Sequence, residues 1–293
     1  MFSSNLRSGL NGKGKAMKKK LTRNRFIMGS YQYGHYPISE FLDMAAKLHF
    51  HQVELYAAEP QISLFSADSR RLETIRRMAE ERGLDIFAIT PEQINYPVNI
   101  AAEEDDLRGR SVAYYCRGVD AAEILGAGRM LVTAGCGYFS HSREDAFRRS
   151  ADSLRTICAY AKRKKVQIIL EAVTPMSSNV VNSPADQKRM IAEMPEDSMV
   201  GMLDIGSMDF MHQSLADYLK SGVMGHVHFH DSHPAVHMVP GDGELPLEDY
   251  LQAIEDSGYT GFYSFEFNDG RYRSDPFTSD ERAVQWLNQH GIQ

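Results

Sequence analysis

Short apolar runs alternate with longer amphipathic segments along the chain from residue 26 onward. The apolar runs contain many β-branched and aromatic residues, and eight of them occur. Such alternation predicts βαβ units with parallel strands. Eight units at this spacing are typical of a closed barrel. We therefore expect one α/β domain, a single (β/α)8 TIM barrel, at residues 26 to 293. The strands are expected to begin near Phe26, Gln52, Asp85, Arg129, Val166, Val200, His226 and Phe262.

Helix-capping residues punctuate the segments between these runs. Serine favours the N-cap, proline the first helical position, and glycine the end of a helix. The final helix is expected at residues 281 to 288, where Trp286, the only tryptophan, should pack it against the barrel. The signals are Ser142 with Asp145, Ser183 before Pro184, and Gly83 and Gly258 at expected helix ends.

An open, doubly wound sheet is the competing topology, because it uses the same alternation of strands and helices. Neither a GxGxxG nor a GxxxxGK[ST] motif follows the first expected strand. The polar residues that interrupt the apolar runs also recur at the ends of many strands rather than at one crevice. Barrel active sites are assembled in this distributed way, which favours the barrel.

The composition is that of a water-soluble protein, with 43% hydrophobic and 24% charged residues. No apolar run approaches the roughly 18 residues that cross a bilayer, so we expect no membrane partner. Three cysteines, Cys116, Cys136 and Cys158, are odd in number and lack CxxC spacing. This pattern excludes a disulfide framework and favours reduced thiols in the cytoplasm.

The charge is distributed unevenly along the chain. Residues 1 to 25 contain eight Lys or Arg and no acidic residue, whereas the remainder has 24 basic and 39 acidic residues, or a net charge of -15. Such an acidic body would repel nucleic acid, so no nucleic-acid partner is expected. The Gly, Ser and Lys content of residues 1 to 25 predicts a disordered basic leader. An alternative is that translation starts at Met17.

Four strand ends in the second half of the chain each place a possible metal ligand within an apolar run. They are Glu171, Asp204, His228 and Glu266. Burying one carboxylate in such a run costs several kcal/mol unless a cation or hydrogen bonds compensate. Any single one could instead cap a loop or pair with Arg or Lys, but one ion that compensates all four is the simpler interpretation. Three carboxylates and one imidazole suit Mn, Co, Ni or Mg.

The segment HVHFHDS, residues 226 to 232, contains three alternating histidines that should face the same side of a strand. One of them can bind the ion, and the others can donate hydrogen bonds or serve as ordinary polar residues. Asp231 could orient a ligand imidazole or accept a substrate hydroxyl. The following HMVPGDG, which begins at His237, is a weak turn signal by itself.

Several longer segments together resemble the sugar phosphate isomerase/epimerase superfamily of xylose isomerase-like TIM barrels. Within it, the chain looks most like the fructoselysine 3-epimerase group, near the tagatose and psicose 3-epimerases. The resemblance covers about residues 26 to 290, and its combination of motifs is specific although each motif alone is not. The segments are ITPEQINYP, LEAVTPMSSNVVNSPAD, MVGMLDIGS, GHVHFHDS and HMVPGDGELPLEDYLQAIEDSGYTGFYSFEF.

The resemblance implies roles for individual residues of this chain. Glu171 opens the E-x-x-T-P segment and corresponds to a metal ligand and acid/base, as does Glu266 of the last strand. Asp204 and His228 correspond to the other two ligands of one divalent ion. His237, ahead of the P-G-x-G turn, corresponds to a substrate contact. We extend the expected substrate contacts to Asp231, Tyr31 and Glu92, with Tyr33, Tyr56 and Tyr96 as further rim tyrosines.

Two positions depart from the pattern of such enzymes. Ser177 stands where relatives tend to have a substrate-binding glutamate, six residues after the first ligand. Ser207 stands where ketose epimerases have a histidine, three residues after the ligand aspartate. The metal ligands are matched, but the substrate contacts differ, so the sugar itself does not follow from the resemblance.

The resemblance implies an isomerase, a metal-dependent 3-epimerase of a ketose or fructosamine-type sugar. Two glutamates would remove and return the proton at carbon 3 through an enediolate, whose charge a divalent ion stabilises. An aldose-ketose isomerase and a polyol dehydratase use nearly the same ligands and stay open, and a barrel endonuclease and a non-catalytic sugar-binding protein are further alternatives. We expect a small-molecule sugar as partner and assembly into a homo-oligomer.

Overall fold

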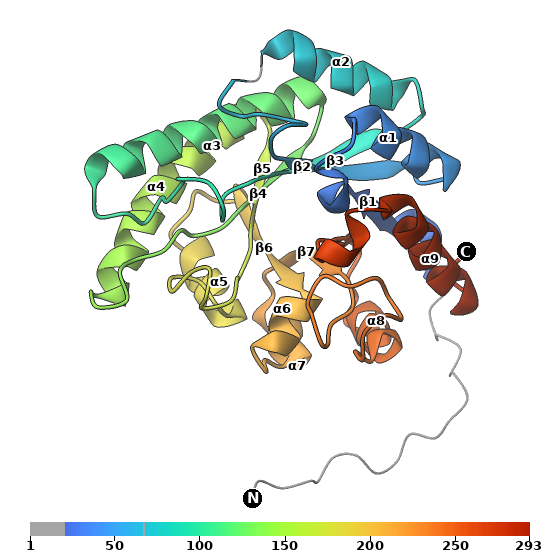
Figure 1. Cartoon of the computed structure of the whole chain (residues 1–293). Coiled ribbons are helices and arrows are strands. Elements are labelled where there is room, and N and C mark those ends of the chain that lie inside the picture. Colours follow the sequence, from blue (N-terminus) through green and yellow to red (C-terminus); the bar gives the residue numbers. More distant parts are fainter. Residues whose placement is uncertain (1–20, 67) are drawn as a thin grey trace, which may run out of the picture.

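Eight parallel strands close into a barrel in the order of the sequence (Figure 1). The structure, a computed structural model, describes residues 21 to 66 and 68 to 293. The prediction of a single (β/α)8 barrel is confirmed. The strands are β1 Phe26–Gly29, β2 Gln52–Ala57, β3 Asp85–Pro91, β4 Arg129–Val132, β5 Gln167–Leu170, β6 Met199–Asp204, β7 Met224–Phe229 and β8 Tyr263–Phe265.

Helices between successive strands lie around the outside of the barrel (Figure 1). Two of them, α6 and α7, separate β6 from β7. The helices are α1 Ile38–Lys47, α2 Ser69–Glu80, α3 Asp105–Leu125, α4 Arg143–Arg163, α5 Pro184–Ile191, α6 Ile205–Phe210, α7 Leu215–Ser221, α8 Leu247–Asp256 and α9 Pro276–Gln289.

A small apolar cluster of Leu131, Ile169 and Met202 joins three neighbouring strands. Side chains two residues apart on a strand share a face. Glu171 therefore follows Ile169 and Asp204 follows Met202 on the same face, one step closer to the carboxyl ends of the strands. The alternation in β5 and β6 thus places a polar layer directly above an apolar one.

The helix caps agree with the sequence signals. The side chains of Ser142 and Ser183 accept hydrogen bonds from the backbone N–H groups of Asp145 and Asp186. Gly83 and Gly258 follow the ends of α2 and α8 and have positive φ angles of 68° and 87°, which glycine adopts without strain. These capping predictions are confirmed.

Helix α9 is longer than predicted, because Asp275 caps it at Thr278 and the helix begins at Pro276. The ring of Trp286 lies 5.7 Å from that of Phe229 on β7, and it also stacks on His290. The prediction that Trp286 packs this helix against the barrel is confirmed.

The barrel domain begins earlier than predicted. Leu21 is buried, the backbone N–H of Arg23 donates to Gln293 at 3.2 Å, and Arg25 pairs with Glu255 at 3.1 Å. Residues 21 to 25, which we assign to the leader from composition, are therefore fixed by contacts with the end of the chain and with α8. Residues 1 to 20 lie outside the described part. Within the described residues, no helix has the length and apolarity that crossing a membrane requires.

Candidate metal centre and active site

The four predicted ligands come together at the carboxyl ends of β5 to β8. One ligand atom from each of Glu171, Asp204, His228 and Glu266 lies within 4.8 Å of the others. Glu171 and Glu266 follow β5 and β8, Asp204 ends β6, and His228 lies within β7. The Nδ1 atom of His228 is 2.6 Å from Glu266 Oε2 and 3.8 Å from Asp204 Oδ2. These strand ends thus provide three carboxylates and one imidazole around one centre.

The clustered carboxylates strongly affect one another. Burial, followed by the charges of Glu266 and Asp204, raises the pKa of Glu171 well above its usual range. Burial also acts to raise the pKa of Asp204, but the neighbouring histidines, His230 first, together outweigh it and hold that pKa well below its usual range. Bringing three carboxylates together costs free energy that a divalent cation would offset. This donor set fits a hard divalent ion.

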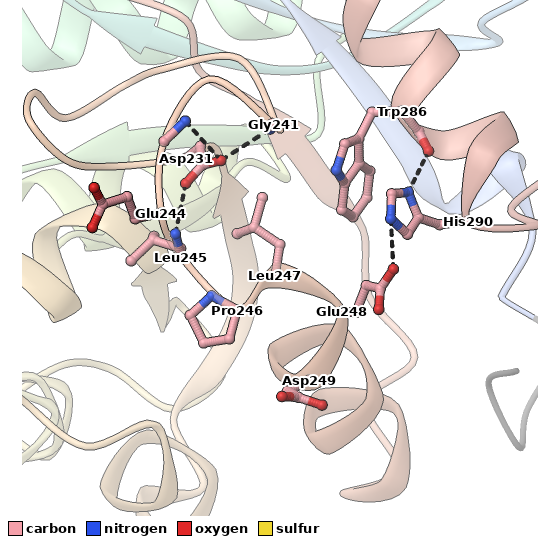
Figure 2. A pocket seen from close by; sticks show the side chains of 11 residues that line it. Asp231, Gly241, Glu244, Leu245, Pro246, Leu247, Glu248, Asp249, Trp286 and His290 are labelled. Carbon is pink, nitrogen blue, oxygen red and sulfur yellow. Dashed lines mark hydrogen bonds and ion pairs between the residues drawn. The ribbon is translucent and has the colours of Figure 1, made fainter. Parts of the chain in front are cut away.

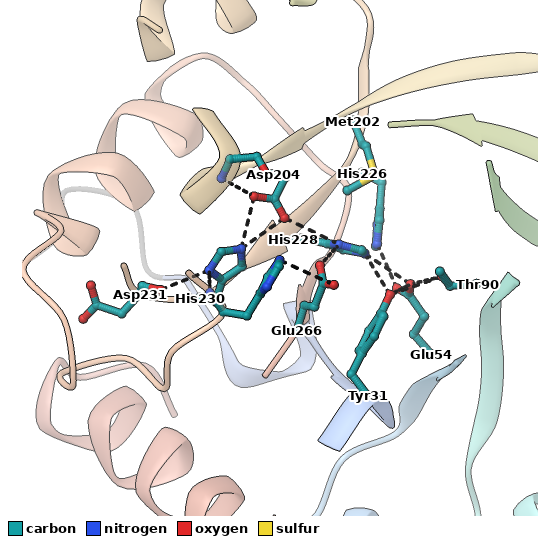
Figure 3. Close-up of polar contacts among 12 residues, drawn as sticks. Tyr31, Glu54, Thr90, Met202, Asp204, His226, His228, His230, Asp231 and Glu266 are labelled. Atoms are coloured by element: carbon teal, nitrogen blue, oxygen red, sulfur yellow. Dashed lines mark hydrogen bonds and ion pairs between the residues drawn. The ribbon is translucent and has the colours of Figure 1, made fainter. Parts of the chain in front are cut away.

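All three histidines of β7 and its end face the barrel interior and contact buried carboxylates (Figure 3). The Nε2 atom of His226 is 3.0 Å from Glu54, and that of His228 is 3.2 Å from the same carboxylate. The Nε2 atom of His230 is 3.1 Å from both carboxylate oxygens of Asp204. The prediction that these histidines share a face is confirmed.

A cavity of about 280 Å³ opens beside the cluster. Glu171 and Glu266 line it, so both glutamates border the space that a ligand would occupy. Three residues that we expect to contact substrate, Tyr31, Glu92 and His237, also line it. The Tyr31 hydroxyl donates to Glu54 at 2.8 Å.

His237 stands at the edge of the cluster with a positive φ of 59°. Its ring centre is 4.6 Å from that of His230, and its Nε2 is 3.6 Å from Glu266 Oε1. The two departures from the family pattern, Ser177 and Ser207, also line the cavity. The cavity is therefore lined by two serine side chains, where relatives are expected to have a glutamate and ketose epimerases a histidine.

Asp231 differs from our expectation of a substrate contact. Its carboxylate accepts hydrogen bonds from four backbone N–H groups of its own loop, and Figure 2 shows those from Gly241 and Leu245. It does not line the cavity beside the cluster. It borders a separate cleft of about 360 Å³ between this loop, α8 and α9, where Trp286 and His290 also lie. The donors are the N–H groups of Ser232, Gly241, Gly243 and Leu245. Asp231 therefore organises the loop that carries His237.

Comparison with known families gives a match to the xylose isomerase-like TIM barrel at residues 42 to 290. The chain belongs to this family. The match covers most of the barrel, including all four strand ends that carry the clustered ligands, and it confirms the family expected from the sequence motifs.

Proteins similar to this chain include sugar epimerases. Fructoselysine 3-epimerase from Shigella flexneri is 28% identical over 244 residues, which cover 81% of this chain and 88% of that protein. D-Psicose 3-epimerase from Agrobacterium fabrum is 24% identical over 229 residues, or 75% and 76% of the two chains. A crystal structure of D-psicose 3-epimerase from Clostridium cellulolyticum has a TM-score of 0.76 at 16% identity and covers 91% of this chain and 100% of that one. The structural likeness shows the shared fold.

Glu54 is a residue of the site that the sequence does not single out. It lies within β2, has 0% exposure, and accepts hydrogen bonds from Tyr31, at 2.8 Å, and Thr90, at 2.6 Å, besides facing His226 and His228. Burial acts to raise its pKa, but the nearby imidazoles, His228 first, hold the pKa well below its usual range. The available signal is a glutamate within the apolar run QVELYA.

Glu92 lies on the other side of the cavity, after β3, and is held by its own loop. It accepts hydrogen bonds from the backbone N–H groups of Ile94 and Asn95, from the Asn95 side chain, and from the Tyr56 hydroxyl. Burial acts to raise the pKa of Glu92, but these donors, Tyr56 first, hold it below its usual value. The prediction that Tyr56 is part of the cavity wall is confirmed, since its ring also stacks on Tyr31.

Proposed function

We propose that this protein is a divalent-metal-dependent epimerase that inverts carbon 3 of a ketose or fructosamine-type sugar. The observation that carries the proposal is the convergence of Glu171, Asp204, His228 and Glu266 beside a cavity that two of them line. The names of the relatives, fructoselysine and D-psicose 3-epimerases, support the same reaction class.

The four converging residues would hold one divalent cation. Such an ion would supply the positive charge that makes removal of a proton beside a carbonyl accessible near neutral pH. Mn, Co, Ni and Mg all suit this oxygen-rich set with one nitrogen donor. Asp204 and His228 are buried, and their role in the proposal is to position the ion rather than to touch the sugar.

Glu171 and Glu266 are the proposed acid/base pair. Both border the cavity, and they come from different strands, β5 and β8. In the proposal, one carboxylate takes the proton from carbon 3 and the other returns a proton to the opposite face of the same carbon. That exchange inverts the centre, and each proton transfer contributes roughly 10² to 10⁴-fold to the rate.

The lining of the cavity supports a neutral or cationic sugar rather than a phosphorylated one. Its acidic members are Glu92, Glu171 and Glu266, and no Lys or Arg is among the described residues that line it. Phosphate recognition in proteins usually relies on Arg, Lys or a helix N-terminus. A fructosamine, whose amine is protonated near neutral pH, suits this acidic surface better than a sugar phosphate. Action in the cytoplasm and assembly into a homo-oligomer remain predictions.

A proton-exchange screen in D₂O tests the proposal. Free ketoses, fructosamine adducts and sugar phosphates are each incubated with the protein and Mn, Co, Ni or Mg. We expect deuterium at carbon 3, together with the inverted sugar, for a ketose or fructosamine. Aldose formation would indicate the aldose-ketose isomerase, loss of water the polyol dehydratase, and no exchange with any sugar a binding protein.

Paired variants test the two-base scheme within the same screen. Glu171→Gln and Glu266→Gln should each reduce epimerisation by about 10² to 10⁴-fold, because each removes one proton carrier. Asp280→Asn is the control, since it changes a buried carboxylate on α9 that does not line the cavity. If either cluster variant still exchanges carbon-bound protons at the wild-type rate, the scheme is wrong.

A further inference from the structure

Glu54 is a fully buried carboxylate that lies behind the cluster and does not line the cavity. It comes from β2, on the half of the barrel that supplies none of the four predicted ligands. Four side-chain donors surround it: Tyr31, Thr90, His226 and His228 (Figure 3). A buried ionised carboxylate is stable only when hydrogen-bond donors or charges replace the water it has lost. Packing alone therefore does not explain this arrangement.

The two nitrogens of the His228 ring face different carboxylates. On one side, Nδ1 lies 2.6 Å from Glu266 Oε2 and faces the ligand cluster. On the other side, Nε2 lies 3.2 Å from Glu54 Oε1. An ionised carboxylate only accepts hydrogen bonds, so Glu54 requires the proton of the imidazole on Nε2. The lone pair of the neutral ring is then left on Nδ1, the nitrogen that faces the centre.

His226 fixes the other oxygen of Glu54. Its Nε2 lies 3.0 Å from Glu54 Oε2, whereas its Nδ1 has no hydrogen-bond partner among the described side chains and backbone. Its ring also stacks on Phe87 at 5.3 Å. Among the described residues, Glu54 is thus the only hydrogen-bond partner of the His226 ring, and it is bound through Oε2, whereas Oε1 faces His228. The Tyr31 and Thr90 hydroxyls share Oε1 and restrain the same group.

We propose that Glu54 is a positioning residue that fixes the tautomer and ring orientation of His228 and thereby sets the affinity of the centre for its divalent ion. The inference rests on the proposed function, because it assumes that the four-residue cluster binds metal. Carboxylates that accept the second N–H of a metal-binding histidine typically change metal affinity or activity by 10 to 100-fold when they are replaced.

The test is a calorimetric titration of the metal-free protein with Mn²⁺, using the full chain. Glu54→Gln places an amide, which can donate as well as accept, where the imidazoles require an acceptor, so we expect the Kd for Mn²⁺ to weaken by about 10 to 100-fold. The matched control is Asp280→Asn, which changes another buried carboxylate. Asp280 accepts from Gln32 at 2.7 Å and from the Tyr33 hydroxyl, and it lies on α9 away from the cluster.

Three outcomes of the titration would overturn parts of this argument. Wild-type protein that binds no divalent ion would remove the proposed function and the inference with it. Glu54→Gln with the wild-type Kd would remove the inference alone. An equal loss of affinity in Asp280→Asn would attribute the effect to general destabilisation and would also remove the inference.

A second measurement does not depend on the folding of any variant. In wild-type protein loaded with diamagnetic Mg²⁺, the ¹⁵N spectrum of the histidine rings should show His228 protonated at Nε2 and unprotonated at Nδ1. A His228 ring that has its proton on Nδ1 would overturn the proposal, whatever the titration gave.

Discussion

The two halves of the barrel contribute different chemistry to the same site. Strands β5 to β8 supply all four residues of the ligand cluster. Strands β1 to β4 supply cavity walls, among them Tyr31 and Tyr56, and one carboxylate, Glu54, that lies behind a ligand histidine. Changes in the second half should therefore abolish the reaction, whereas changes in the first half should adjust affinity. Four predictions test this division, from the largest expected effect to the smallest.

The largest effect is expected for Asp204→Asn in the second half. Asparagine can still cap α6, where Asp204 Oδ1 accepts the N–H of Ser207 at 2.5 Å, but it loses the negative charge. The Kd for a divalent ion should weaken by more than about 100-fold, beyond the range for groups that act through a ligand. Calorimetric titration measures it. Wild-type affinity in this variant would contradict the assignment of the cluster to β5 to β8.

The second effect concerns the loop after β7. Asp231→Asn places an amide NH₂ against backbone N–H donors, so the free energy of unfolding should fall by about 1 to 3 kcal/mol. Urea denaturation measures this change. Asp249→Asn, at an exposed carboxylate bordering the same cleft, is the control and should stay within about 0.5 kcal/mol of wild type. Unchanged stability with a raised KM would restore Asp231 as a substrate contact.

The third effect belongs to the first half of the barrel. Tyr56→Phe removes the hydroxyl that donates to Glu92 at the cavity wall. One such hydrogen bond contributes about 1 kcal/mol, so KM for the sugar should rise by roughly fivefold while the metal Kd stays unchanged. Tyr33→Phe removes a similar hydroxyl-carboxylate bond, to Asp280, away from the cavity and should leave KM unchanged. A weakened metal Kd in Tyr56→Phe would show that this part of the cavity wall also acts on the ligand cluster.

The smallest effect is a pH dependence at Glu92. Its pKa is lower in the folded protein, so its ionised form stabilises the fold above the ordinary carboxyl range, and this contribution is lost as the pH falls through the folded pKa. The difference in unfolding free energy between wild type and Glu92→Gln should be below about 1 kcal/mol near neutral pH and shrink at about pH 3. A difference that grows in acid would contradict the direction of the shift.

Most of the fold follows from the sequence, because each strand is a compact apolar run. The structure begins every strand within two residues of the predicted position. Helix α9, the one helix for which a residue range was predicted, starts five residues before the expected position. Its signal, Asp275 before Pro276, is a capping pair that hydrophobic periodicity does not reveal.

The ligand cluster was predictable because its members interrupt apolar runs at strand ends, where barrel sites are built. Glu54 was not, since it lies in the middle of β2, and only the closed barrel brings it to His226 and His228, more than 170 residues away in the chain. The role of Asp231 in its loop was not predictable for a related reason. Its partners include backbone N–H groups ten to fourteen residues later, which side-chain types do not indicate.

The loop that Asp231 organises has a consequence for how a ligand enters. A single carboxylate ties together both ends of the segment that presents His237 to the cavity. The segment is therefore already ordered before a sugar binds. Little binding free energy is then lost to ordering it. We expect binding of the sugar to follow one-step kinetics, with no slow rearrangement of residues 232 to 245 before it is bound.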